Sequence, residues 1–298
     1  MIRSLFKNLI INNDFIRNSL TINFIYIFYS FFKTLLINGF KIFFVSRLKK
    51  DKNSDTLIIL GTGNTINELS DNDFIKFKDF DVAGLSYSLL LSTKQTYYFF
   101  ESPRNIETLY LEEFNNKLID LLHQSEKRQF ARNIIWKNSE SNSIKKFLDV
   151  SNYHHLIVCH IISNNAKKVI QLLNIFDFLK LNRFFLLQSR GSISALMHFA
   201  KSLNYRRVIF SGVDLNNEDY FFLNNHNYEK YKLTNPNEFI TDDKKVRSNS
   251  EHFTNDPKYG IKMIDFINHF LKSNKDIEFF VTSKKSMLSK LMPVWKNN

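Results

Sequence analysis

The chain has 298 residues, enough for one large domain or two small ones, and carries a formal net charge of +12. Hydrophobic residues make up 44% of the chain and aromatic residues 15%, which excludes intrinsic disorder. The single cysteine, Cys159, excludes a disulfide scaffold and a cysteine-rich zinc module. A basic chain of this kind suggests a nucleic acid, an anionic membrane or an anionic substrate as partner, so the location of the charge is informative.

Residues 1–50 carry most of the positive charge. They hold eight Lys or Arg residues against one acid, Asp14, so +7 of the +12 lies here, together with eleven aromatic residues. The charge-free run Asn18–Phe32 has 15 residues, short of the roughly 20 that a membrane span needs. We therefore favour a helical, amphipathic segment that lies on an anionic membrane surface. A helical hairpin packed on the domain and a true span within residues 20–45 are the alternatives.

The basic segment matches neither a signal peptide nor a nucleic-acid-binding module. No small-residue cleavage site follows its apolar run, which a signal peptide would need. The chain shows no zinc module, RNP-type aromatic strand or recognition helix, so we do not expect a nucleic acid as partner.

Strands and helices alternate after the polar break at Lys49–Asp55. Short apolar runs predict strands at Thr56–Leu60, Asp81–Leu85, Thr96–Phe100, His155–His160, Arg207–Asp214 and Asp276–Val281. Helical spacing predicts helices at Ile66–Phe77, 105–125, 164–180, Ser192–Leu203 and Lys258–Lys272, with a short basic helix near Trp295. This alternation indicates an α/β fold with a parallel sheet in residues 51–298, and the polar stretch from 215 to about 254 is long enough to be functional.

The first candidate site is the glycine loop Gly61-Thr62-Gly63 directly after a predicted strand. Two glycines allow a backbone to approach a phosphate, and a helix N-terminus behind them favours an anion. The third glycine of a dinucleotide fingerprint is replaced by Ile66, and no P-loop Gly-Lys-Ser/Thr is present. The loop is therefore either a nucleotide site or a structural turn.

Acidic residues give two further candidates. Gly212 and Asp214 end a predicted strand, where open α/β sheets bind ligands, so Asp214 is either a ribose ligand or a turn cap. Asp71-x-Asp73 and Asp79-x-Asp81 match a triplet that many glycosyltransferases use for a divalent cation. We expect both triplets to be solvated, and we expect no metal site.

The stretch from 215 to 254 holds the candidate catalytic groups. His252 precedes a predicted helix, and a loop histidine can act as a general base because its pKa lies near neutrality, although most such residues are surface residues. The hydroxyl of Tyr220 could donate to a leaving phosphate, or the ring could simply pack beneath the loop.

The order of these motifs resembles that of the bacterial lipooligosaccharide sialyltransferases of glycosyltransferase family 42, over roughly residues 56–295. Those proteins open with an apolar strand, a Gly-Asn-Gly-Pro-Ser-Leu loop and a helix, and here the loop reads Gly61-Thr62-Gly63-Asn64-Thr65-Ile66. The strongest match is the small-residue helix Ser192–Ala200 followed by a strand that ends Ser211-Gly212-Val213-Asp214-Leu215, where the family has Ser-Gly-Ile-Asp-Phe. A lid loop, a histidine and a helix beginning Ile261-Lys262 follow in the same order.

The resemblance implies a Rossmann-like parallel sheet, a variant of the glycosyltransferase A fold, with a lid subdomain at about 215–254. It implies an inverting, metal-independent transfer of sialic acid or a related nonulosonic acid from a CMP-activated donor, without a cofactor, to a glycan or glycolipid acceptor. In that family the lid histidine is the base and lid tyrosines stabilise the phosphate, which suggests His252 and Tyr220. The glycine loop (Gly61, Thr62, Gly63 and Thr65) and the helix serine, Ser192, would contact the donor.

The chain departs from the family at donor-contacting positions. The asparagines after the second and third strands are replaced by Ser86 and Glu101, and the first lid tyrosine by Asn216. His252 lies three residues farther from its helix than expected, so a gapless alignment would place Asn255 there. A transferase with another nucleotide-sugar donor and a non-catalytic, membrane-bound glycan-assembly protein are therefore the alternatives. We expect a peripheral location at the cytoplasmic face of the bacterial inner membrane, with a homo-oligomer left open.

Overall fold

The computed structural model describes residues 13–38, 42–91, 93–101, 120, 131–137, 153–216, 221, 254 and 261–296. The chain divides into two compact units. Unit 1 comprises residues 1–50, 155–204 and 254–277, and unit 2 comprises residues 51–154, 205–253 and 278–298. The sequence-based division at residue 50 coincides with one of these boundaries, but residues 1–50 share a unit with two later stretches of chain.

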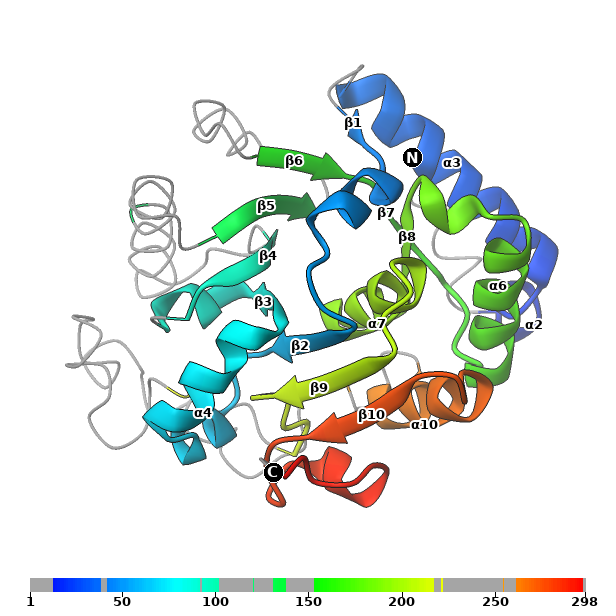
Figure 1. The fold of residues 1–298 in the computed structure, drawn as a ribbon. Coiled ribbons are helices and arrows are strands. Elements are labelled where there is room, and N and C mark those ends of the chain that lie inside the picture. The colour runs from blue at the N-terminus through cyan, green and yellow to red at the C-terminus, as the bar shows by residue number, and fades with distance from the viewer. Residues whose placement is uncertain are drawn as a thin grey trace, which may run out of the picture. The chain divides into compact units, whose positions relative to one another are not determined.

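Unit 2 is built on a parallel sheet of six strands (Figure 1). The strands are β2 (Thr56–Leu60), β3 (Asp81–Leu85), β4 (Gln95–Glu101), β5 (Ala131–Lys137), β9 (Arg207–Ser211) and β10 (Glu278–Val281). They lie in the order β5-β4-β3-β2-β9-β10, and each neighbouring pair is parallel. The predicted α/β fold with a parallel sheet is confirmed, although β5 was not predicted.

The strand order reverses direction between β2 and β9. From β2 the chain adds β3, β4 and β5 on one side, and then returns to place β9 and β10 on the other side of β2. Both strands that flank this reversal are short and apolar, and all five residues of β2 are buried. A crevice outside the carboxyl ends of the strands at such a reversal is where open α/β sheets bind ligands.

Short helices follow the strands of unit 2. The predicted helix Ile66–Phe77 is divided into the 3-10 helix η3 (Asn64–Glu68), the α-helix α4 (Asp71–Lys76) and the 3-10 helix η4 (Phe77–Asp79). The division occurs at Ser70, because Ser70 and Asp73 form a reciprocal capping box that starts a new helix. Two further short helices in the described part of unit 2 are η5 (Ser86–Leu90) and η12 (Met287–Lys290).

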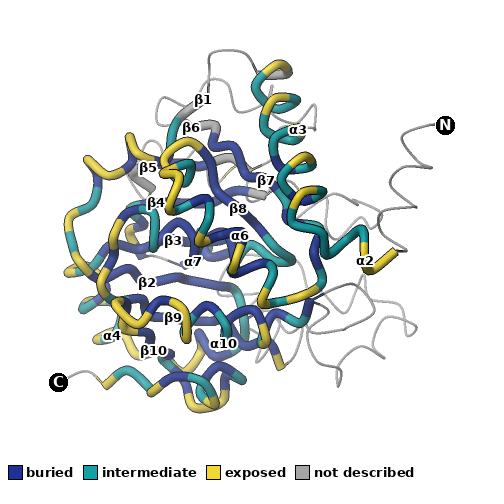
Figure 2. The backbone as a smooth tube through the Cα atoms, turned by 90° about the vertical axis from the view of Figure 1, so that its right-hand side faces the viewer, coloured by how far each residue is buried: buried dark blue, intermediate teal, exposed yellow. Residues whose placement is uncertain are grey.

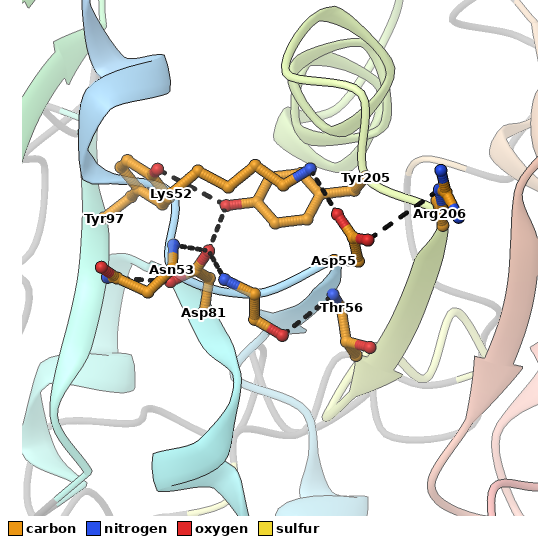
Figure 3. Close-up of polar contacts among 9 residues, drawn as sticks. Lys52, Asn53, Asp55, Thr56, Asp81, Tyr97, Tyr205 and Arg206 are labelled. Carbon is orange, nitrogen blue, oxygen red and sulfur yellow. Dashed lines mark hydrogen bonds and ion pairs between the residues drawn. The ribbon is translucent and has the colours of Figure 1, made fainter.

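Asp81 ties together the amino ends of the strands in unit 2 (Figure 3). Its carboxylate, only 1% exposed, accepts hydrogen bonds from the backbone N–H groups of Asn53 and Ser54 at 2.9 and 3.1 Å. The Tyr205 hydroxyl donates to it at 2.8 Å, and burial raises the pKa of that hydroxyl. The expectation that Asp81 is solvated is wrong, because a segment before β2 and a residue before β9 converge on it.

Unit 1 contains the four longest helices that the structure describes, together with shorter ones. These are α2 (Asp14–Arg17), α3 (Leu20–Asn38), α6 (Ala166–Phe178), α7 (Ser192–Ser202) and α10 (Met263–Ser273), with the 3-10 helices η2 (Val45–Asp51, whose last residue belongs to unit 2) and η7 (Leu181–Arg183). The predicted single strand at His155–His160 is two strands, β6 (Tyr153–Leu156) and β7 (Val158–His160). A parallel pair joins β7 to β8 (Leu186–Gln188), and β1 (Ile42–Phe43) pairs with the second half of β6.

Helix α3 packs along unit 1 by one face. Asn23 and Ile27 on this face are almost completely buried, and the Phe24 ring stacks on Phe176 of α6 with 5.0 Å between centroids. The Asn23 side chain accepts hydrogen bonds from the backbone N–H groups of Ile162 and Ser163. Among the described residues, no helix is both long and apolar enough to cross a bilayer. Figure 2 shows exposed positions recurring along the length of α3.

Candidate functional site

Most of the residues predicted to contact a donor lie where four neighbouring strands of unit 2 end. The loop Gly61–Thr65 follows β2, Ser86 follows β3, Glu101 ends β4, and Gly212 and Asp214 follow β9. Because β4, β3, β2 and β9 are consecutive and parallel, their carboxyl ends lie along one edge of the sheet. The predicted positions are therefore brought to the edge where α/β sheets bind ligands.

The two loops that flank the strand-order reversal are in direct contact. The Gly61 N–H donates to the Ser211 carbonyl and the Gly63 N–H to the Gly212 carbonyl, both at 2.8 Å. A Cβ atom on Gly61 would lie 2.3 Å from the Gly212 oxygen, and Gly212 has a φ of +64°. The glycines of both loops thus serve a close backbone approach, and this structural role holds whether or not a phosphate binds there.

Asp214 lies behind the glycine loop, at the amino end of η3. Its carboxylate is 4% exposed and accepts hydrogen bonds from the Thr65 N–H at 3.0 Å and from the Thr65 hydroxyl. Burial raises the pKa of Asp214, while the two hydrogen bonds from Thr65 oppose that rise. The helix that follows, η3, is a five-residue 3-10 helix. The Asp214 carboxylate therefore already accepts the hydrogen bond that the amino end of η3 offers through Thr65. A phosphate bound in the cavity would need a different hydrogen-bond donor.

Lys285 is a cation at the rim of the same crevice. Its ammonium lies 2.5 Å from one carboxylate oxygen of Glu68, and the Ser283 hydroxyl donates to the other at 2.5 Å. Burial alone would raise the pKa of Glu68, but hydrogen bonds from Lys285 and Ser283 hold it below its usual range. The Lys285 side chain is 80% exposed, so its ammonium can turn from Glu68 to an incoming phosphate at little cost.

These groups line one cavity of about 300 Å³ within unit 2. Its walls are Asn64, Thr65, Asn67, Glu68, Asp214, Asn216 and Lys285. The lining combines three side-chain amides, two carboxylates and one ammonium. Amides offer both donors and acceptors, which suits a pyrimidine base or a ribose, and the ammonium suits a phosphate. The arrangement can hold a small, polar ligand.

Two hydrogen bonds join the wall of the cavity to Phe221. The backbone N–H of Phe221 donates to the Thr62 carbonyl at 3.0 Å, and its carbonyl accepts from the Asn67 amide at 2.8 Å. Phe221 itself is fully buried. The chain is therefore anchored beside the glycine loop one residue after Tyr220, although Tyr220 itself lies outside the described residues.

Of the predicted site residues, Thr65 and Asp214 are the two in the described lining of this cavity. His252 and the stretch from 222 to 253 lie outside the described residues, so the lid and its base stay predictions. Ser192 is the first residue of α7 and belongs to unit 1. Within the ranges that the structure describes, no three His, Cys, Asp or Glu side chains come together as a metal site.

Glu68, Lys285 and Ser283 were missed by sequence reasoning. More than 200 positions separate Glu68 from the other two, and none of the three belongs to a recognisable motif. The available signal was positional, since Ser283 and Lys285 follow the last predicted strand just as Asp214 follows its own. In a parallel sheet, the residues one to four positions beyond every strand lie at the edge where ligands bind, and Ser283 and Lys285 are of this kind.

Comparisons with known proteins leave the chain without an assigned relative. No protein-family model matches it, and no curated protein matches it significantly.

Proposed function

We propose that this chain is an inverting glycosyltransferase that moves sialic acid or a related nonulosonic acid from a CMP-activated donor to a surface glycan. The observation that carries the proposal is the cavity at the reversal of strand order, which is lined by Asn64 and Thr65, at the end of the predicted loop, and by Asp214. Nucleotides bind at such reversals in open α/β sheets. The CMP-activated donor is proposed because the order of motifs along the chain resembles that of the family 42 sialyltransferases.

The cavity suggests a division of roles among its residues. Asn64, Asn67 and Asn216 provide amides for the cytosine and ribose, and Lys285 exchanges Glu68 for the donor phosphate. A CMP-activated donor has one phosphate, and the ammonium of Lys285 can give it a charge-assisted hydrogen bond, which is stronger than a hydrogen bond between neutral groups. Asp214 orders the glycine loop through Thr65 and need not contact the donor.

In the proposed reaction an acceptor hydroxyl attacks the anomeric carbon of the donor sugar. The oxygen–carbon bond to the acceptor forms as the bond to the CMP phosphate breaks, so the configuration inverts. His252 takes the acceptor proton, and the Tyr220 hydroxyl donates a hydrogen bond to the departing phosphate. Neither role requires a metal ion, since base and hydrogen-bond donor are supplied by side chains.

We further propose a lipid-linked or surface glycan as the acceptor, at the cytoplasmic face of the inner membrane. The basic, aromatic segment 1–50 supports this location.

A donor screen tests the chemistry. The full chain is incubated with CMP-sialic acid, other CMP-sugars or UDP-sugars and a panel of glycoside and glycolipid acceptors. Released nucleotide and product mass are measured with and without EDTA. We expect acceptor-dependent CMP release that EDTA does not change. His252→Ala should lower the rate about 10²–10⁴-fold, whereas His226→Ala, in the same stretch of chain, should not. Release of UDP instead of CMP would replace the proposed donor.

One observation favours a second candidate, a non-catalytic glycan-assembly protein on this fold. The Thr65 N–H that a phosphate would use is already hydrogen-bonded to Asp214. If no CMP-sugar or UDP-sugar is turned over and no nucleotide raises the melting temperature, this candidate replaces the enzyme.

A further inference from the structure

Helix α3 carries an exposed apolar stripe along its outer face. The stripe, which we call the outer stripe, consists of Ile25, Tyr29, Phe32 and Leu36, exposed by 61, 56, 54 and 84%. At 3.6 residues per turn these four positions lie within about 60° of one another around the helix axis. They form one continuous band over three turns, whereas isolated exposed apolar residues would scatter around the helix.

The orientation of the outer stripe is fixed by the opposite face of α3. Ile27 is fully buried and Asn23 is 1% exposed. The Asn23 amide donates to the carbonyls of Arg17 and Ser19 at 2.8 and 2.9 Å, while its oxygen accepts two backbone N–H groups. Any rotation of α3 that turned the stripe toward unit 1 would break the hydrogen bonds of Asn23 with Ile162 and Ser163. The stripe therefore faces away from unit 1.

Exposed apolar side chains are concentrated in unit 1. Among the described residues, eight of the nine large exposed hydrophobic side chains belong to this unit, and Ile75 of unit 2 is the ninth. The eight are Phe15, Ile25, Tyr29, Phe32, Leu36, Phe178, Leu179 and Phe184. The last three flank η7, which is tied to α3 by the rings of Phe31 and Phe185, 5.0 Å apart between centroids. The segment that carries these three side chains therefore packs beside α3.

Basic residues surround this surface. Lys180 and Arg183 are exposed between Phe178 and Phe184, and Arg47, Lys49 and Lys50 are exposed in η2. Helix α3 contains no acid, and Asp14 is the only acid in residues 1–50. A second copy of this chain would place one such basic surface against another, with Asp14 of each copy as the one acid of residues 1–50 to offset the repulsion. Anionic lipid headgroups complement the cations, while acyl chains accommodate the stripe.

We propose that the outer stripe of α3 is a docking surface for an anionic lipid bilayer. The helix lies in the plane of the interface, with the stripe in the region between headgroups and acyl chains and with the η2 and η7 cations at the phosphates. Tyr29 and Phe32 contribute aromatic rings at the level where such rings are favoured. Docking requires neither a nucleotide nor an acceptor, so it stands independently of the proposed transferase reaction.

Vesicle co-sedimentation of the full chain tests this surface. We expect the chain to bind vesicles of phosphatidylglycerol mixed with phosphatidylethanolamine, and to bind phosphatidylcholine vesicles far less. The double variant F32S/L36S should lower the partition coefficient about tenfold or more, because two large apolar side chains no longer enter the lipid. Ile75→Ser is the matched control, since it removes an equally exposed side chain from unit 2, and its binding should equal that of the wild type.

A second measurement locates the surface directly. Cys159 is fully buried, so an environment-sensitive dye attached to Phe32→Cys or Ile75→Cys reports on the introduced site. We expect anionic vesicles to shift the emission of the Phe32→Cys dye to the blue and to leave the Ile75→Cys dye unchanged. Equal vesicle binding by F32S/L36S and the wild type would overturn the proposal. So would dissociation of a wild-type dimer by F32S/L36S without loss of vesicle binding, which would assign the stripe to a second copy of the chain.

Discussion

Lys285 is the residue on which the proposed phosphate contact depends. Its ammonium pairs with Glu68 at 2.5 Å but remains 80% exposed. A phosphate can replace this carboxylate as a partner and gains a charge-assisted hydrogen bond in exchange. We therefore treat the pair with Glu68 as the resting arrangement of an anion-binding group, since an exposed pair of this kind contributes little to stability.

Replacing Lys285 with Met tests that contact. We expect the affinity for CMP, measured by titration calorimetry, to fall about tenfold, because a charged hydrogen bond is lost while the shape of the side chain is retained. Lys284→Met is the matched control, since Lys284 is also exposed but does not line the cavity. Unchanged CMP affinity in Lys285→Met would remove this residue from the site.

Asn23 shows how one polar residue fixes a helix. All of its hydrogen bonds are made within unit 1, and they join α3 to the backbone around Ile162. Asn23→Leu would leave the N–H groups of Ile162 and Ser163 buried without acceptors. We expect a loss of about 2–4 kcal/mol in the free energy of unfolding, measured by urea denaturation. Thr21→Leu, an exposed position in the same helix, should change it by less than about 0.5 kcal/mol. Equal effects of the two substitutions would contradict this role of Asn23 in α3.

Helices α6 and α7 are joined by a partly buried carboxylate, Asp177, whose side chain is 15% exposed. His198 is fully buried and its Nδ1 accepts the Leu187 N–H, so Nε2 carries the proton that faces Asp177 at 3.3 Å. Lys201 lies 2.6 Å from the other carboxylate oxygen. Burial alone would raise the pKa of Asp177, but the His198 hydrogen bond and the Lys201 charge hold it below its usual range.

A lowered carboxyl pKa makes stability depend on pH in one direction. The folded state then favours the ionised form, so the contribution is complete above the unfolded pKa of about 3.9 and is lost as the pH falls through the lower folded pKa. Asp177→Asn should cost about 1–2 kcal/mol at pH 7, and the difference from the wild type should shrink below about pH 4. Urea denaturation midpoints of the wild type and of Asp177→Asn, measured between about pH 3 and pH 7, give this difference in stability. Asp276→Asn is the control, because Asp276 is exposed. A difference that stays constant with pH would assign the effect to packing.

The elements that were predicted well are those specified by local sequence. The runs of β2 and β3 begin and end at the predicted residues, because each is a short stretch that is buried along its whole length. Strand β5 was missed because Arg132, Asn133 and Lys137 interrupt its apolar pattern. Asn133 is nonetheless buried, since its amide donates to the Thr96 carbonyl at 3.1 Å. Such a partner lies on another strand and is invisible to a local pattern.

The candidate site was predictable in part for the same reason. Glycine loops and strand ends are local signals, so Gly61 and Asp214 were found. The role of Asp214 depends on Thr65, 149 positions away, and the pair of Glu68 with Lys285 depends on the sheet order. Neither pairing follows from spacing along the chain.

At the scale of the whole molecule, charge and cavity belong to different units. The exposed apolar and basic residues around α3 lie in unit 1, whereas the cavity between the ends of β2 and β9 lies in unit 2. The +7 that residues 1–50 contribute to the net charge of +12 belongs to the proposed lipid-docking surface, and the proposed phosphate contact uses the single ammonium of Lys285. Loss of vesicle binding and loss of nucleotide binding should accordingly be separable by mutation.

The central claim is that the cavity of unit 2 binds a cytidine nucleotide, and calorimetric titration of the full chain tests it most directly. We predict saturable binding of CMP with a Kd between about 1 μM and 1 mM, weaker binding of UMP, AMP and GMP, and competition between CMP and CMP-sialic acid. Absence of CMP binding, or tighter binding of another nucleotide, would contradict the claim.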